Sequence, residues 1–116
     1  MLLSRRDPTK LKENIIMKIW DERIENELTV FISGELDLTG APELTAFLDG
    51  KLNDVASLVI DMKGITYLSS AGIRAILTAY RAMGNNSFRI VNCNPIVYEV
   101  FEITGLSDAL SIEKAE

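Results

Sequence analysis

The stretch of sequence that decides the fold is Leu58-Val59-Ile60-Asp61-Met62-Lys63-Gly64-Ile65-Thr66-Tyr67-Leu68-Ser69-Ser70-Ala71-Gly72-Ile73-Arg74. Its first five residues form a short, mainly apolar run that is typical of a strand buried on both faces. Near the end of the stretch, Ile73 begins an apolar repeat with helical spacing, which continues at Ile76, Leu77 and Tyr80. Gly84 suits the end of that helix. The stretch therefore predicts a central strand over 58–62 and a helix over about 71–83.

Upstream of this stretch the chain predicts a hairpin and a helix. Apolar and polar side chains alternate within 28–35, and a similar run covers 17–23, with the short polar segment 24–27 between them. Pro42 suits the first turn of a helix, where its missing N–H would have no partner. The apolar positions of that helix recur at three- and four-residue spacing, at Leu44, Phe47, Leu48 and Leu52.

Downstream, residues 88–92 predict another strand, and Asn94-Pro95 supplies an N-cap and a first-turn proline for a third helix. Gly105 ends that helix, and 110–112 predict a short last strand. The order β-β-α-β-α-β-α-β predicts an α/β fold with parallel later strands. We expect a single domain over 17–116, in which a mixed β-sheet has an N-terminal hairpin followed by alternating helices and strands. Residues 1–16 are predicted to be an N-terminal extension.

The composition excludes several classes of function. The 116-residue chain has a net charge of −5, which argues against the clustered Lys and Arg of a nucleic-acid-binding surface. It has no His and one Cys, Cys93, so a disulfide framework, a Cys/His zinc site and His-dependent catalysis are all excluded. No window approaches the ~20 apolar residues of a membrane span, and no secretory signal opens the chain. We expect a cytoplasmic protein with no nucleic-acid partner and no direct membrane insertion.

Two carboxylates are candidates for chemistry. Asp37 and Asp61 both fall at predicted C-terminal ends of strands, where open α/β sheets place ligand sites. Such a pair can hold a metal or act as acid and base; alternatively, each carboxylate braces the loop that follows it. Further ligand candidates are lacking, and the residues after Cys93 do not form the anion loop of a cysteine-dependent phosphatase. We therefore favour bracing, and we predict a protein that is not an enzyme and has no cofactor or metal.

Two hydroxyls stand where the second helix is predicted to begin, at Ser69 and Ser70. A serine at this place caps a helix, because its oxygen accepts a hydrogen bond from a free N–H of the first turn. The same N–H groups and the positive end of the helix dipole also suit a phosphate. Arg74 lies four residues after Ser70 and so on the same side of the helix. Capping and phosphorylation are therefore both compatible with this segment.

Two motifs resemble the STAS domain family, which is named for sulfate transporters and anti-sigma factor antagonists. The resemblance spans roughly residues 17–112. The first motif is Gly34-Glu35-Leu36-Asp37-Leu38-Thr39-Gly40-Ala41-Pro42-Glu43-Leu44, and the second covers residues 61–74 of the stretch quoted above. Together the two motifs are specific, whereas either alone is weak.

The resemblance implies a function in transcriptional regulation. In the antagonists that this chain resembles, a serine at the start of the second helix is phosphorylated by the anti-sigma factor, which is itself a serine kinase. A serine phosphatase reverses the modification, and the unphosphorylated antagonist binds the anti-sigma factor and frees the sigma factor. By its place in the motif, that serine corresponds to Ser70. Candidate contacts for the phosphate or the partner are Asp37, Ser69, Gly72 and Arg74.

The chain departs from the family's switch motif at two positions. That motif reads Asp-Ser-Ser/Thr-Gly, whereas here Ser69 takes the place of the Asp and Ala71 follows Ser70. The departure motivates an alternative function, in which the domain is a non-phosphorylated STAS scaffold subunit of a signalling or transporter complex. A third hypothesis, a small-molecule binder or weak hydrolase, depends on Asp37 and Asp61.

Overall fold

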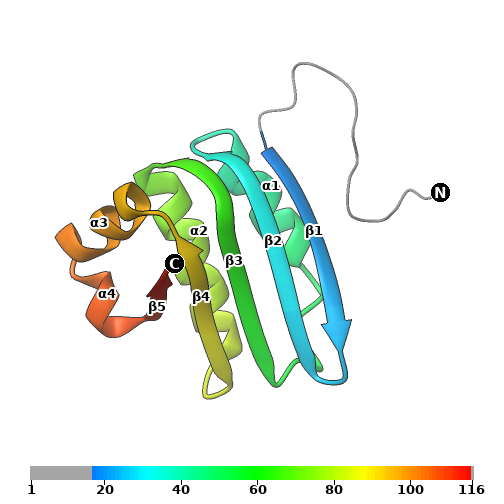
Figure 1. The fold of residues 1–116 in the computed structure, drawn as a ribbon. Helices are drawn as coiled ribbons and strands as arrows, with labels where there is room; N and C mark the ends of the chain where they lie inside the picture. The colour runs from blue at the N-terminus through cyan, green and yellow to red at the C-terminus, as the bar shows by residue number, and fades with distance from the viewer. Residues whose placement is uncertain (1–16, 116) are drawn as a thin grey trace.

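The computed structural model describes residues 17–115, so the predicted extension 1–16 lies outside the described residues. Within them, five strands form one sheet in the order β1-β2-β3-β4-β5 (Figure 1). The strands are β1 (Met17–Ile24), β2 (Glu27–Leu36), β3 (Ser57–Leu68), β4 (Ser87–Cys93) and β5 (Ser111–Lys114). The helices are α1 (Gly40–Leu48), α2 (Ser70–Met83), α3 (Pro95–Ile103) and α4 (Leu106–Ala109).

The pairing of the strands confirms the predicted mixed sheet. β1 and β2 form an antiparallel hairpin, with Met17 opposite Gly34 and Ile24 opposite Glu27. The pairs β2–β3, β3–β4 and β4–β5 are all parallel. The connections β2–β3, β3–β4 and β4–β5 each lead to the next strand in the same direction along the sheet. Connections between parallel strands are right-handed, so successive ones that run in the same direction place their helices on the same face. Figure 1 accordingly shows α1 and α2 together behind the sheet.

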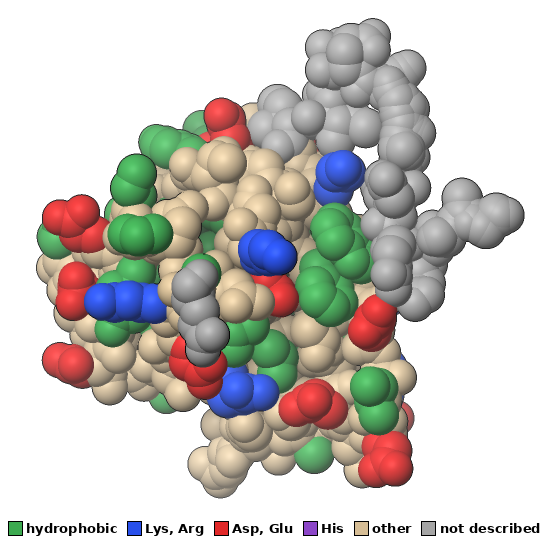
Figure 2. Space-filling model, in the orientation of Figure 1, with side chains coloured by type: hydrophobic (Ala, Val, Ile, Leu, Met, Phe, Trp, Pro, Cys, Tyr) green, Lys and Arg blue, Asp and Glu red, His purple; other side chains and the backbone are tan. Residues whose placement is uncertain are grey.

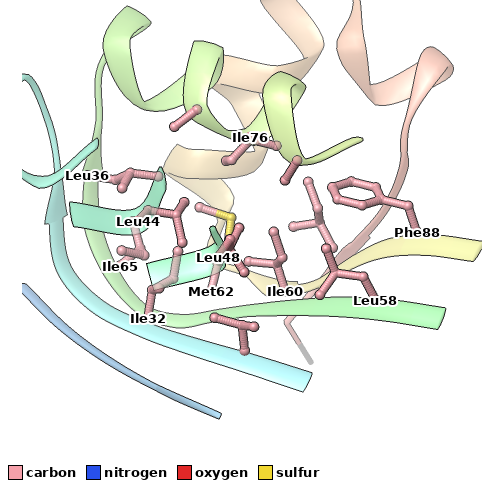
Figure 3. Packing of buried hydrophobic residues seen from close by; sticks show 14 of the residues in the cluster. Ile32, Leu36, Leu44, Leu48, Leu58, Ile60, Met62, Ile65, Ile76 and Phe88 are labelled. Atoms are coloured by element: carbon pink, nitrogen blue, oxygen red, sulfur yellow. The ribbon is translucent and has the colours of Figure 1, made fainter. Parts of the chain in front are cut away.

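The hydrophobic core lies between the sheet and its helices (Figure 3). Alternate residues of β2 are buried there, including Val30 and Ile32, as the period-two pattern predicted. Leu44 from α1 and Ile76 from α2 pack against them and are fully buried. Burying a side chain of this size contributes about 1.5–3 kcal/mol, so the helix-covered face provides the main stability of the domain.

The strand β3 is longer than the sequence indicated. It was predicted to end near residue 62, but it continues to Leu68 through an irregularity in its pairing with β2. Phe31 lies opposite Asp61, whereas Ser33 lies opposite Gly64, so β3 carries one extra residue at this point. A Cβ on Gly64 would stand 2.6 Å from the Ser33 hydroxyl, so the close approach requires glycine. Because the bulge interrupts the apolar pattern, the sequence did not predict the part of β3 after residue 62.

The buried stripe of α2 also differs from the predicted one. Its buried residues are Gly72, Ala75, Ile76, Ala79 and Met83. Ile73 and Leu77 are half-buried, and Tyr80 is 39% exposed. The buried face of α2 is therefore rotated about the helix axis relative to the face predicted from the large side chains. Small residues, Gly and Ala, lie on this buried face because α2 packs closely against the sheet and α1.

Two further boundaries were missed. The helix α1 ends at Leu48, one turn before the predicted Leu52, and Gly50 follows with φ +81°. The short helix α4 was not predicted from the sequence; Gly105, which was expected to end α3, precedes it with φ +80°. No helix within residues 17–115 is long and apolar enough to cross a membrane.

Candidate functional site

The junction between β3 and α2 fixes Ser69 firmly. Ser69 is the N-cap of α2, and its hydroxyl oxygen accepts a hydrogen bond from the Gly72 N–H at 3.3 Å. The Ser69 N–H donates to the Leu36 carbonyl at 3.1 Å, and the hydroxyl donates to the same oxygen at 3.4 Å. The predicted capping role therefore belongs to Ser69, which ties the start of α2 to the end of β2.

Ser70 has the opposite character. It is the first residue of α2, its side chain is exposed, and its hydroxyl makes no hydrogen bond to any described residue. Because Ser69 occupies the Gly72 N–H, the first-turn donors without an intrahelical partner are the N–H groups of Ser70 and Ala71. These groups and the helix dipole make the surroundings of the Ser70 hydroxyl favourable to an anion.

Gly72 is buried and allows the first turn of α2 to approach β2. A Cβ at this position would lie 2.4 Å from the Leu36 carbonyl oxygen and 2.9 Å from Leu68 Cδ1. Neither atom can retreat easily, because one is backbone and the other belongs to the core. Gly72 therefore sets the distance between α2 and β2, and its N–H is already bound to Ser69.

Asp37 braces the start of α1, as the favoured interpretation of the sequence predicted. Its Oδ1 accepts hydrogen bonds from the Thr39 N–H at 3.0 Å and the Gly40 N–H at 2.8 Å. Its carbonyl oxygen accepts from the Ala41 N–H at 2.8 Å. Since Asp37 directly follows Leu36, the starts of α1 and α2 both depend on the same end of β2.

Arg74 lies on α2 one turn beyond Ser70, with an exposed side chain. Its guanidinium forms no ion pair with a carboxylate within residues 17–115. Its backbone carbonyl accepts a hydrogen bond from the Thr78 hydroxyl at 2.9 Å. The structure therefore places Ser69, Ser70, Gly72 and Arg74 in the first turns of α2, and places Asp37 on the neighbouring connection.

Asp61 was predicted at the C-terminal end of its strand, and this placement is wrong because β3 continues to Leu68. Asp61 stands in the middle of β3, where it lies opposite Phe31 of β2. Phe31 is six residues before Asp37 in the chain, and six residues of a strand span about 20 Å. Asp61 is therefore far from Asp37. Its Oδ1 accepts from the Lys63 N–H and its Oδ2 from the Asn92 side-chain amide, both at 2.9 Å. The described residues hold no group of three or more His, Cys, Asp or Glu side chains that could bind a metal. The structure therefore does not bring Asp37 and Asp61 together, as the third hypothesis, a small-molecule binder or weak hydrolase that uses both, requires.

Cys93 is buried at the end of β4. Burial and the nearby negative charge of Asp61 raise the pKa of its thiol to about 12. Because the thiolate is the nucleophilic form, Cys93 is unreactive at neutral pH. This agrees with the sequence analysis, which gave Cys93 no catalytic role.

The fold and the site together define a small α/β domain with an exposed serine hydroxyl, that of Ser70, at the start of a helix. The STAS domain matches residues 18–116, and the chain belongs to this family. The anti-sigma-B factor antagonist of Listeria monocytogenes is 28% identical over 106 residues, covering 89% of this chain and 92% of that protein. The anti-sigma-B factor antagonist of Bacillus subtilis is 30% identical over 90 residues, covering 76% and 83%.

Solved structures show the same fold. An anti-sigma factor antagonist from Mycobacterium paratuberculosis matches with a TM-score of 0.77 at 25% identity, over 84% of this chain and 85% of that one. The phosphorylated form of the Bacillus cell fate determinant SpoIIAA matches with a TM-score of 0.64 at 17% identity, over 81% and 89%. The predicted α/β sheet with its N-terminal hairpin is thereby confirmed as a STAS fold.

Proposed function

We propose that this chain is a cytoplasmic anti-sigma factor antagonist that binds an anti-sigma factor of the serine kinase type. Phosphorylation of Ser70 releases the partner, a serine phosphatase restores the binding form, and the cycle regulates sigma-factor-dependent transcription. The observation that carries the proposal is the exposed Ser70 hydroxyl, without a hydrogen-bond partner among the described residues, beside the fully engaged Ser69. The names of the relatives support the same role. The protein acts by binding and does not itself catalyse a reaction.

A phosphate on Ser70 is compatible with the fold. It adds about −1.5 to −2 charges at neutral pH, and the first turn of a helix stabilises such a charge. The N–H groups of Ser70 and Ala71 are available as donors, and Arg74 lies one turn away on the same side of α2. The Ser70 hydroxyl makes no hydrogen bond to the described residues, so the modification breaks no side-chain hydrogen bond among them.

The same phosphate opposes binding. A partner that covers unmodified Ser70 meets a small neutral hydroxyl, whereas after modification it must desolvate a doubly charged group. Every 1.4 kcal/mol of lost binding free energy weakens affinity about tenfold. Release of the partner then requires no large change in the conformation of the domain.

Incubation with a serine-kinase anti-sigma factor and ATP, followed by intact-mass measurement, tests the proposal. We expect one added phosphate on the wild-type chain, none on Ser70→Ala, and one on the matched control Ser69→Ala. Peptide mapping should place the phosphate on Ser70. Stable association with a large complex and no phosphate on any serine would instead favour the scaffold function.

A further inference from the structure

The face of the sheet opposite α1 and α2, here called the open face, carries apolar side chains of its own. Val30 and Ile32 point into the core, so Phe31 between them points to the open face. Trp20 lies opposite Phe31 on β1 and therefore points the same way. Val59 is 5% exposed although it is not part of the core cluster, so it is buried on this face. Figure 2 views the domain from the open face and shows hydrophobic side chains gathered over β1 and β2.

The open face is hollowed beside its aromatic pair. The rings of Trp20 and Phe31 stack, with their centroids 5.7 Å apart and their planes at 11°. They form one side of a hollow of about 580 Å³, whose other lining residues include Asp61, Lys63 and Asn92. The hollow therefore combines an apolar wall with charged side chains of both signs.

Asp61 presents a fixed carboxylate to this hollow. Its two oxygens accept one hydrogen bond each, from the Lys63 N–H and from the Asn92 side-chain amide. Within residues 17–115 the carboxylate forms no ion pair. Each carboxylate oxygen has a second lone pair, so Asp61 can accept from a cation without losing either hydrogen bond. An arginine suits this place best, because its guanidinium stacks on aromatic rings and donates to carboxylates.

The occupant of the hollow is indicated by the residues that precede β1 in the sequence. We propose that residues 1–16, which lie outside the described residues, fold back over the open face. In this arrangement an arginine of the segment binds Asp61, and aliphatic side chains of the segment cover Trp20 and Phe31. The inference does not depend on the function proposed for Ser70.

The composition of residues 1–16 matches the open face. The segment contains five Leu or Ile residues, and four basic residues against two acidic ones, which is a net charge of +2. The whole chain has a net charge of −5, which leaves −7 for residues 17–116, so the two parts attract each other. Arg6 and Asp7 are neighbours in the segment and are complementary to Asp61 and Lys63, which line the hollow two residues apart.

The point of attachment makes this contact intramolecular. The segment joins β1 at Met17, which precedes Trp20 by three residues, or about 10 Å at the rise of a strand. Asp61 lies two strands beyond Trp20, which adds about 10 Å across the sheet. A chain spans up to about 3.3–3.6 Å per residue, so Arg6, eleven residues before Met17, is within reach of Asp61. A short tether gives an effective concentration of about the millimolar range, so modest contacts are sufficient.

Trp20 is the only tryptophan of the chain, so its fluorescence reports directly on the hollow. The test measures quenching of the full chain by acrylamide, because a neutral quencher does not respond to the charge of the variants. The quenching constant should be at least about twofold higher for Arg5→Glu combined with Arg6→Glu than for wild type, since losing the charge-assisted contact raises the uncovered population. Asp61→Asn should act in the same direction. The matched control Asp49→Asn, at an exposed residue that follows α1 on the other side of the sheet, should have no effect.

Combining the substitutions separates a contact from a structural disturbance. If the arginines bind Asp61, then adding Asp61→Asn to Arg5→Glu and Arg6→Glu should raise the quenching constant no further. Full addition of the two effects would overturn the pairing. An unchanged quenching constant in the arginine variant would overturn the whole proposal. Quenching of wild type that falls as the chain concentration rises would also overturn it, because a second copy would then cover the open face. None of these outcomes affects the proposal for Ser70.

Discussion

The helix-covered face of the sheet and the edge where its strands meet the helices expose their apolar residues to different extents. On the covered face, residues such as Ile60 and Ile76 are completely buried and pack into one cluster. At the edge, Leu38 and Ile96 point into solvent on connections that hydrogen bonds hold in place. The residues that form the core and the apolar residues exposed at this edge are therefore different residues. A substitution at the edge should change the stability of the domain very little.

The largest loss of stability is expected in the covered face. Ile76→Ala should lower the free energy of unfolding by about 2–5 kcal/mol, because it removes buried methyl groups and leaves a cavity. Its neighbour Leu77 belongs to the stripe predicted from the sequence but is only half-buried, so Leu77→Ala should cost clearly less. Urea unfolding at fixed pH measures both variants. An equal cost for the two would show that α2 is rotated relative to the sheet we describe.

Gly72→Ala tests the place where the two regions meet. Alanine normally stabilises a helix relative to glycine by about 1 kcal/mol. Here the added Cβ would collide with the Leu36 carbonyl oxygen and push α2 away from β2, so we expect a net loss of about 1–3 kcal/mol. Thermal or urea unfolding measures the change. A gain in stability would mean that the approach of α2 to β2 is looser than the structure shows.

The adjacent serines provide a smaller and more specific test. Ser69→Ala removes the N-cap of α2 and should cost about 1 kcal/mol, within a range of roughly 0.5–2. Ser70→Ala should change stability by much less, because its hydroxyl makes no hydrogen bond to the described residues. Urea unfolding of the two variants side by side makes the comparison. Equal costs would contradict the division into a structural and a free serine.

Much of the fold could be predicted from the sequence, because its signals are local. The alternation in β2, the N-cap at Asn94 and the first-turn position of Pro95 all depend on neighbouring residues, and the structure shows each of them. The continuation of β3 was missed because its bulge depends on how Ser33 and Gly64 meet across two strands.

The site was predictable only in part, for the same reason. The sequence placed Ser69 and Ser70 at a helix start, but the division between them depends on the Leu36 carbonyl, which lies more than thirty residues away in the chain. The interaction of Asn92 with Asp61 was also missed, because it joins two strands and Asn92 has φ +63°. The exposure of Leu38 and Ile96 could not be predicted either, because it depends on how the folded domain covers its apolar residues.

The central claim is that phosphate on Ser70 acts on binding and leaves the fold intact. The decisive measurement is the dissociation constant of a serine-kinase anti-sigma factor for the wild-type chain and for the same chain phosphorylated at Ser70. We predict at least about tenfold weaker binding after phosphorylation, with an unchanged circular dichroism spectrum. Ser70→Asp should weaken binding in the same direction, and Ser70→Ala should retain it. Equal binding by the unmodified and phosphorylated chains would contradict the claim.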